Sequence, residues 1–288
     1  MAQIFRSLIF VPGNNAKFLE NAKTLPADIV CLDLEDSVPG PEKDQARKMV
    51  GGAVTKRGFG ASVFVRINPS TTSVADEDLR EITREGLAGV VVPKVDRPED
   101  LKRIEVLLEG LERERGLART DIIPSIESPG GVRNCYEIAS YSERIPAVVF
   151  GIFDLLHNMG IEYTKKGRGA MHARARVALD AAAARVVAID GIWQDTKDDE
   201  GLREDCRRGR SLGYKGKSVI HPSQIDTVHE EFKPNAAEIE WSKRVCGAYL
   251  ESMKKGRGAT TLDGLMIDEV HYKRADALLK AAGEPAEG

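Results

Sequence analysis

The stretch IVCLDLED, residues 29–36, opens with four consecutive apolar residues and closes on three carboxylates separated by a leucine. A short, continuously apolar run of this kind is typical of a parallel strand that is buried on both faces. The carboxylates follow the point where such a strand ends. In parallel α/β folds the carboxyl end of the strand is where polar side chains gather for chemistry. The stretch therefore predicts a buried strand that ends at a functional edge.

Comparable apolar runs recur along the chain, separated by longer segments with helical periodicity. The longest of these segments ends at Arg115 and is followed by Gly116, and the last one ends at Leu212 before Gly213, as expected for helix stops. Eight strands alternating with helices predict a (β/α)₈ TIM barrel, with an open doubly wound sheet as the alternative. The expected strands are Ser7–Val11, Ile29–Leu34, Ser62–Ile67, Gly89–Val95, Ile122–Glu127, Ala147–Phe153, Val186–Ile192 and Lys217–Ile220, and the expected helices include Glu42–Val54, Pro98–Arg115, Met171–Arg185 and Asp198–Leu212.

Two further helices follow the eighth strand, at about Asn235–Lys254 and Asp268–Ala282, with the glycine-containing segment Gly256–Gly264 between them. A barrel is complete without them. We therefore expect residues 1–232 to form the barrel and residues 233–288 to form a C-terminal helical extension.

Composition excludes several classes of protein. The 288 residues carry a net charge of −3 without a long block of lysine or arginine, which argues against nucleic acid as the main partner. The chain contains no run of about 18 apolar residues, so a membrane partner is not expected. The four cysteines form no C-x-x-C pair, so free thiols in a reducing, cytoplasmic compartment are expected.

Polar residues follow several of the predicted strands at the end where chemistry is expected. Arg66 and Asn68 close the third strand, Lys94 the fourth, Glu127 the fifth and Asp154 the sixth. Because the carboxyl ends of parallel strands meet at one rim of a barrel, these side chains are predicted to converge there.

Two of these carboxylates, Glu127 and Asp154, end neighbouring strands and form a candidate Mg²⁺ site, because Mg²⁺ takes one or two protein carboxylates and keeps waters. The alternative is a structural ion network with Arg66 and Lys94. Arg66 is suited to clamping a carboxylate or stabilising an enolate oxygen. Lys94 has two interpretations, as an electrostatic partner or as a Schiff-base amine.

Seven segments, in order from residue 6 to residue 268, together resemble the citrate lyase β-subunit-like family within the HpcH/HpaI aldolase superfamily. Each segment alone is a weak signal, whereas the ordered set is specific to the family but not to one substrate. The segments are residues 6–13 (RSLIFVPG), 32–36 (LDLED), 65–68 (VRIN), 93–95 (PKV), 126–130 (IESPG), 216–225 (GKSVIHPSQI) and 264–268 (GLMID).

The resemblance implies a (β/α)₈ barrel that uses Mg²⁺. On the matching positions Glu127 and Asp154 would hold the metal, and Asp33 and Glu35 would orient metal-bound water. The substrate-binding set implied by the matching segments is Arg66, Asn68, Glu127 and Pro129.

The resemblance also implies roles at the reacting carbon. Arg66 would bind the oxygen of a thioester enolate, with Lys94 among the catalytic residues. Asp268 would be the acid/base, delivered from an adjacent subunit of a homotrimer or hexamer. Spacing arguments do not single out Asp268.

The chain departs from the family pattern at one place. Relatives often carry a glutamate just before the metal-binding aspartate, and here that position is Phe153. The segment that follows, Leu155–Arg168, does not match closely. Substrate choice is the property that these departures affect.

The function implied is cleavage or condensation of a 2-hydroxy-acid acyl-CoA, such as citramalyl-CoA or malyl-CoA, to give acetyl-CoA and a 2-oxo acid. Alternatives are a citrate lyase β subunit acting on a carrier-protein thioester and a class II pyruvate aldolase that does not use CoA. A Schiff-base aldolase using Lys94 and a non-catalytic CoA-ester-binding subunit are also consistent with the residues. The physiological direction and the stereochemistry stay open.

Overall fold

The computed structural model describes residues 5–284, and the chain divides into two compact units, Met1–Phe232 and Lys233–Gly288. The first unit contains all the residues of the predicted strands and the second contains the two C-terminal helices.

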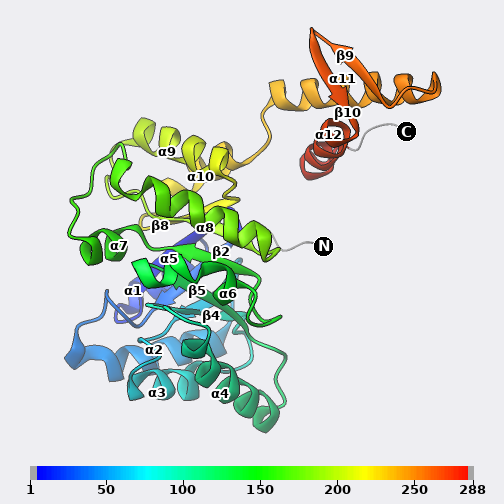
Figure 1. Cartoon of the computed structure of the whole chain (residues 1–288). Helices are drawn as coiled ribbons and strands as arrows, with labels where there is room; N and C mark the ends of the chain where they lie inside the picture. The colour runs from blue at the N-terminus through cyan, green and yellow to red at the C-terminus, as the bar shows by residue number, and fades with distance from the viewer. Residues whose placement is uncertain (1–4, 285–288) are drawn as a thin grey trace. The chain divides into compact units, whose positions relative to one another are not determined.

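The first unit is a closed barrel of eight parallel strands with helices around it (Figure 1). Each strand pairs with the next, and β1 pairs with β8 through Ser7 opposite Lys217, so the sheet has no free edge. The predicted (β/α)₈ TIM barrel is confirmed and the open doubly wound sheet is wrong. The strands are β1 (Ser7–Pro12), β2 (Ile29–Asp33), β3 (Ser62–Arg66), β4 (Gly89–Val92), β5 (Asp121–Ile126), β6 (Ala147–Phe150), β7 (Val187–Asp190) and β8 (Gly216–Val219).

The helices of this unit begin and end largely where the sequence signals place them. Gly116 and Gly213 both adopt the left-handed conformation that ends α4 and α9. The α-helices are α1 (Ala16–Ala22), α2 (Lys43–Lys56), α3 (Ser73–Ile82), α4 (Glu99–Arg115), α5 (Pro129–Arg133), α6 (Cys135–Ala139), α7 (Ile152–Met159), α8 (Met171–Ala183), α9 (Asp199–Leu212) and α10 (Gln224–Phe232), with 3₁₀ turns η1 (Gly40–Glu42) and η2 (Arg168–Ala170).

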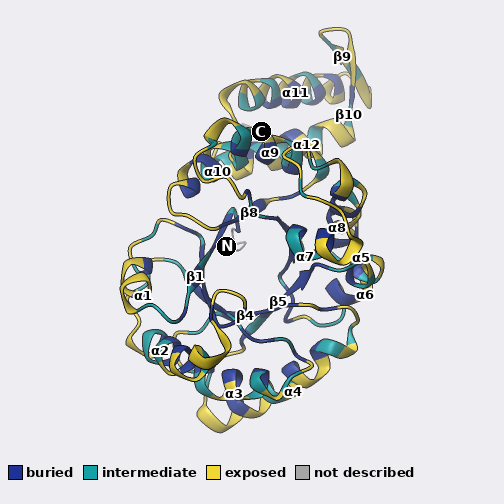
Figure 2. Cartoon of the chain, turned by 90° about the vertical axis from the view of Figure 1, so that its left-hand side faces the viewer, coloured by how far each residue is buried: buried dark blue, intermediate teal, exposed yellow. Residues whose placement is uncertain are grey.

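The core has two layers because successive side chains of a strand point to opposite faces. In β2, Ile29 and Cys31 pack inside the barrel, whereas Val30 and Leu32 pack between the strands and the helices. Figure 2 shows the ring of buried strands, surrounded by helices whose outer faces are exposed. The alternation decides which residues at each strand end face the barrel axis.

The sixth strand is shorter than predicted. The expected strand Ala147–Phe153 ends at Phe150, and α7 begins at Ile152 after Gly151. Asp154 is therefore in the first turn of a helix and not at the end of a strand. The apolar run was misleading because Ile152 and Phe153 continue it beyond the last strand residue, although they already belong to the helix.

The second unit consists of α11 (Ala236–Lys254), an antiparallel hairpin of β9 (Ala259–Leu262) and β10 (Leu265–Asp268), and α12 (Glu269–Ala282). Val245, Ile267 and Leu279 belong to its small core. The sequence analysis predicts no hairpin here and places only a glycine-containing segment between the two helices. Its turn is formed by Asp263 and Gly264, which both have positive φ, and Asp-Gly is a recognised hairpin signal.

Two chain-wide features complete the fold. All four cysteines are buried and free, as expected. Among the described residues, no helix is both long and apolar enough to cross a membrane.

Candidate active site at the carboxyl rim of the barrel

A cavity of about 540 Å³ opens at the carboxyl ends of the strands. Side chains two or four positions apart on a strand point to the same face. Asp33 and Arg66 reach the cavity because they lie two positions after the inward-facing Cys31 and Phe64, and Glu127 lies four positions after an inward-facing residue of β5. Asp154 joins them from the first turn of α7. The wall consists of Phe10, Pro12, Asp33, Asp36, Ser37, Arg66, Ser125, Glu127, Val149, Phe150, Gly151, Ile152, Phe153, Asp154, Ile192, Gln194, Ser218 and Ile220.

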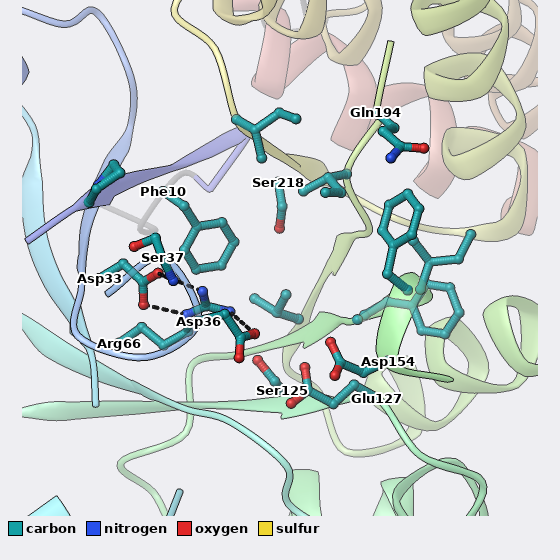
Figure 3. Close-up of a pocket in the computed structure, with 18 residues that line it drawn as sticks. Phe10, Asp33, Asp36, Ser37, Arg66, Ser125, Glu127, Asp154, Gln194 and Ser218 are labelled. Atoms are coloured by element: carbon teal, nitrogen blue, oxygen red, sulfur yellow. Dashed lines mark hydrogen bonds and ion pairs between the residues drawn. The ribbon is translucent and has the colours of Figure 1, made fainter. Parts of the chain in front are cut away.

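Arg66 and Asp33 form the central pair of the cavity (Figure 3). Arg66 Nε donates to Asp33 Oδ1 and Nη2 donates to Oδ2, each at 2.7 Å. The backbone amides of Glu35 and Ser37 donate to the same two oxygens. A carboxylate offers about four acceptor positions, so Asp33 is fully occupied. Asp33 thus holds Arg66 in place, and the water-orienting role that the resemblance implied stays a prediction.

The charges of this pair stabilise each other. Burial opposes ionisation of both groups, but the hydrogen bonds and the charge of Arg66 outweigh it and hold the pKa of Asp33 below its usual value. Asp33 and its neighbours likewise keep the pKa of Arg66 well above its ordinary value despite burial. Arg66 also stacks on Phe10, with its guanidinium carbon 4.7 Å from the ring centroid. Phe10 was not predicted to be a site residue, although it lies two positions after the inward-facing Leu8.

Glu35 is a buried carboxylate beside this pair. Its nearest cations are Lys94 Nζ, 2.8 Å from Oε1, and Arg66 Nη1, 3.2 Å from Oε2. Neither contact is aligned as a hydrogen bond, and both oxygens lack a hydrogen-bond partner among the described residues. Burial raises the pKa of Glu35 despite these cations. Glu35 therefore keeps acceptor capacity, and the water-orienting role that the resemblance implied stays a prediction.

Lys94 contributes through both its backbone and its side chain. It adopts a positive φ of 56°, which is uncommon for a residue with a side chain, and its backbone N–H donates to Glu127 Oε1 at 2.6 Å. The attraction of Glu35 outweighs burial and raises the pKa of Lys94, so the amine is protonated. The amine of Lys94 is protonated, pairs with Glu35 and does not belong to the cavity wall. These observations support the electrostatic interpretation of Lys94 over the Schiff-base one.

Glu127 and Asp154 lie at the same side of the cavity (Figure 3). Burial and the negative charges of Asp154 and Glu35 raise the pKa of Glu127 to about 8. A Cβ on Gly151 would overlap the Glu127 side chain, so the glycine is what lets α7 come this close.

The residues fit a Mg²⁺ ion. The pair combines two oxygen donors with mutual negative charge that a cation would neutralise, and the oxygens of Glu35, which accept no hydrogen bond from the described residues, are buried nearby. No group of three or more His, Cys, Asp or Glu side chains that could hold a metal occurs within residues 5–284. Mg²⁺ takes one or two protein carboxylates and fills its other positions with water or substrate.

Three predicted residues lie elsewhere. The Asn68 amide and backbone N–H both donate to Asp78 in α3, and Pro129 is the first residue of α5 after the capping residue Ser128. Neither Asn68 nor Pro129 belongs to the cavity wall, so their substrate-binding roles stay predictions. Asp268 belongs to the second unit.

Asp268 is the N-cap of α12, directly after β10. Its Oδ1 accepts from the backbone amides of Val270 and His271, and lies 2.6 Å from His271 Nδ1. These hydrogen bonds, led by that of the His271 side chain, lower the pKa of Asp268. Asp268 is therefore an ionised, oriented carboxylate on a turn.

Sequence comparison identifies the family to which this site belongs. Residues 6–222 match the family model described as HpcH/HpaI aldolase/citrate lyase, which covers every strand of the barrel. The chain belongs to the HpcH/HpaI aldolase/citrate lyase family. Its relatives include the citrate lyase subunit beta of Escherichia coli strain K12, 33% identical over 280 residues, which are 96% of this chain and 93% of the relative. The (3S)-malyl-CoA thioesterase of Cereibacter sphaeroides is 32% identical over 283 residues, covering 98% and 95%.

Solved structures of the HpcH/HpaI family show what similar barrels bind. The protein CitE from Mycobacterium tuberculosis, in complex with magnesium, acetoacetate and coenzyme A, matches with a TM-score of 0.81 and 27% identity, over 99% of this chain and all of that one. A citrate lyase beta subunit from the same organism is complexed with oxaloacetate and magnesium, with a TM-score of 0.68 and 26% identity over 80% of this chain and 98% of that one. Magnesium is thus used within the family, whose description covers aldolases and lyases.

Proposed function

We propose that this protein is a Mg²⁺-dependent carbon–carbon lyase that acts on a 2-hydroxy-acyl-CoA, such as citramalyl-CoA or malyl-CoA. The products would be acetyl-CoA and a 2-oxo acid. One observation carries the proposal: the buried Glu127 and the adjacent Asp154 share a cavity with a guanidinium that is fixed by Asp33. The magnesium and coenzyme A complexes of a related protein support it.

Glu127 and Asp154 would hold the metal, and Glu35, whose oxygens accept no hydrogen bond from the described residues, would orient a water beside it. Mg²⁺, when bound, supplies a Lewis acid that polarises the oxygen of the 2-hydroxy acid and lowers its pKa. Lys94 fixes the Glu127 carboxylate through its backbone N–H. These residues therefore prepare the oxygen that becomes the carbonyl of the 2-oxo acid.

Arg66 would stabilise the other product as it forms. Loss of the hydroxyl proton makes the new carbonyl, the adjacent carbon–carbon bond breaks, and its electron pair becomes the thioester enolate. Arg66 uses two of its five N–H groups on Asp33, which leaves donors on Nη1 and Nη2 for an enolate oxygen. A donor held in place before the reaction stabilises the developing charge without reorganisation.

The ionised carboxylate of Asp268 would accept the proton lost by the hydroxyl, relayed through water, and then donate it to the enolate carbon to give acetyl-CoA. We propose that it comes from a neighbouring copy of the chain in a homotrimer or hexamer. In its support, Leu265, Met266 and Val270 are exposed apolar residues within three positions of Asp268. Exposed apolar groups of this size favour an interface.

A second candidate function is hydrolysis of the thioester itself. It is favoured by the match to (3S)-malyl-CoA thioesterase over nearly the whole chain. That reaction would release CoA and leave the 2-hydroxy acid intact, so its products differ from those of the lyase.

The test is a product assay with citramalyl-CoA and malyl-CoA, each with Mg²⁺ and with excess EDTA. Mg²⁺-dependent formation of acetyl-CoA and a 2-oxo acid is expected. Free CoA with an intact 2-hydroxy acid would support the thioesterase instead. Turnover of carrier-protein thioesters alone would support a citrate lyase β subunit, and binding without turnover of any thioester or free hydroxy acid would support a non-catalytic role.

A further inference from the structure

The wall of the cavity is divided between charged and apolar side chains. The charged side chains are Asp33, Asp36, Arg66, Glu127 and Asp154. Most of the remaining wall is apolar, and includes Phe10, Val149, Ile152, Phe153, Ile192 and Ile220. The polar side chains among the rest, such as Gln194 and Ser218, are neutral (Figure 3).

The charges of the wall are unbalanced. Four carboxylates face one guanidinium, and a bound Mg²⁺, which requires all four to be ionised, would leave a net charge of −1. Glu35 and Lys94, which pair with each other outside the wall, add one charge of each sign and leave this balance unchanged. Arg66 is the one cation among the described residues of the wall; it pairs with Asp33, and its remaining donors are those proposed for the enolate oxygen. The wall therefore offers no further cation to a second carboxylate of the substrate.

The apolar part lies beside the proposed metal site. Phe153 directly precedes Asp154 in the first turn of α7, so a metal-binding oxygen and an aromatic ring enter the same cavity from adjacent positions. Tyr163 supports the ring from behind, with the centroids 4.8 Å apart, and both residues pack against the core. Ile192 follows β7 and Ile220 follows β8, and both extend the apolar surface.

We propose that the carbon bearing the substrate hydroxyl carries a small alkyl group and not a carboxymethyl group, with Phe153 as the residue that determines this preference. The 2-oxo acid product is then of the pyruvate or 2-oxobutanoate type and not of the oxaloacetate type. This inference rests on the proposed lyase function. Its physical basis is the free energy of leaving water. An unpaired carboxylate that loses its hydration against an apolar, negatively charged wall binds less favourably, whereas burial of an alkyl group against the same wall is favourable.

Tyr163 is assigned as a positioning residue for Phe153. It is absent from the cavity wall, and it reaches the substrate only through the Phe153 ring. Tyr163→Ala is expected to lower the preference for alkyl substrates while leaving Mg²⁺ affinity unchanged. A substitution that merely loosened the fold would instead affect all substrates equally.

The experiment compares kcat/KM for citramalyl-CoA, its 2-ethyl analogue, malyl-CoA and citryl-CoA at saturating Mg²⁺. The methyl and ethyl compounds are expected to exceed citryl-CoA by about 100-fold or more, and malyl-CoA by roughly 10-fold. Phe153→Ala is expected to remove most of the advantage over malyl-CoA, while Phe153→Lys is expected to raise citryl-CoA relative to the others. Phe18→Ala, in an exposed aromatic on α1 outside the cavity, is the matched control.

Equal or better turnover of citryl-CoA by the wild type would overturn the inference while leaving the lyase function intact. If no thioester is turned over, the lyase function fails, and equilibrium binding then decides the inference separately. Calorimetry with Mg²⁺-loaded protein would compare 2-oxobutanoate with oxaloacetate, which differ mainly by a methyl against a carboxylate. Tighter binding of 2-oxobutanoate is expected, and tighter binding of oxaloacetate would overturn the inference.

Discussion

Two buried ionic clusters in the same barrel differ in how their charges are matched. The outer cluster lies between the strands and helices and consists of Arg174, Asp190, Asp205 and Lys217. It has two cations and two anions, with Lys217 Nζ 2.6 Å from Asp205 and Arg174 Nη1 2.9 Å from Asp205. Each charge has an opposite partner.

The inner cluster, at the rim of the barrel, is not balanced. Asp33 is fully hydrogen-bonded, whereas Glu35 contacts Lys94 and Arg66 without an aligned hydrogen bond, and Glu127 faces Asp154. A charge network that serves only the fold is expected to be neutral, because an uncompensated buried charge destabilises it. The excess of carboxylates, and not burial of charge as such, therefore distinguishes the proposed site.

The largest effect is expected in the outer cluster. Asp205→Asn leaves Lys217 and Arg174 with one anion between them, and should lower the free energy of unfolding by about 3–5 kcal/mol. Urea denaturation in EDTA measures it. Glu200→Gln, in an exposed carboxylate of the same helix, is the control and should change stability little. A loss below about 1 kcal/mol would show that the cluster is not a structural one.

Within the inner cluster, Asp154→Asn should abolish the Mg²⁺-dependent activity that is proposed for the protein. Removal of a metal ligand is expected to reduce kcat/KM by about 10³-fold, because the metal supplies several kcal/mol of charge stabilisation. The variant should fold normally, since Asp154 is only half-buried. Activity near that of the wild type, with unchanged Mg²⁺ affinity, would refute the assignment of this ligand.

Arg66→Ala should reduce kcat by roughly 10²–10³-fold, the usual cost of losing a donor to a developing oxyanion. Arg66→Lys is expected to recover only part of the loss, because lysine cannot keep the two-point contact with Asp33 and still offer donors to the substrate. Measurement of kcat at saturating Mg²⁺ separates this effect from metal binding. Full activity in the alanine variant would exclude the enolate role.

Mg²⁺ should stabilise the protein through the inner cluster alone. At a free Mg²⁺ concentration of about 100 times the dissociation constant, the free energy of unfolding should rise by about 2.7 kcal/mol. The increase should be missing in Asp154→Asn. Its persistence in that variant would place the ion elsewhere.

The smallest effect has the opposite sign to the first. In EDTA, Glu127→Gln should raise the free energy of unfolding by about 1 kcal/mol, because it removes a buried carboxylate that Asp154 and Glu35 repel. The same measurement on Asp205→Asn gives a loss. Destabilisation of similar size in both variants would remove the distinction between the clusters.

The sequence predicted more of the fold than of the site. Buried strands can be recognised in the sequence because each strand of a parallel barrel is a continuous apolar run. Helix ends can be recognised at Gly116 and Gly213, because glycine favours the left-handed backbone conformation that ends a helix. Part of the site could also be predicted, since Arg66 and Glu127 lie at the ends of predicted strands. Asp154 was predicted as a strand-end residue and was found in a helix, because the apolar run continues past Phe150.

The sequence contains signals for two further features, the hairpin and the place of Phe10, but none for the contact that Asn68 makes. The Asp263–Gly264 turn indicated the hairpin that precedes Asp268. Strand parity would have placed Phe10 in the cavity, two positions after the inward-facing Leu8. Asn68 follows a strand in the same way as Arg66, yet its side chain binds Asp78 in α3, which sequence position does not show.

By itself, the sequence determined the alternation of buried strands and helices, several helix ends, and the polar residues that reach one rim. Only the tertiary structure decided which charges pair. Arg66 is 33 positions from Asp33 and donates two hydrogen bonds to it, while Glu35, two positions after Asp33, contacts Lys94 and Arg66 without an aligned hydrogen bond. The physical reason is that charges interact over a few ångströms, and closure of the barrel sets those distances between residues that are remote in the chain.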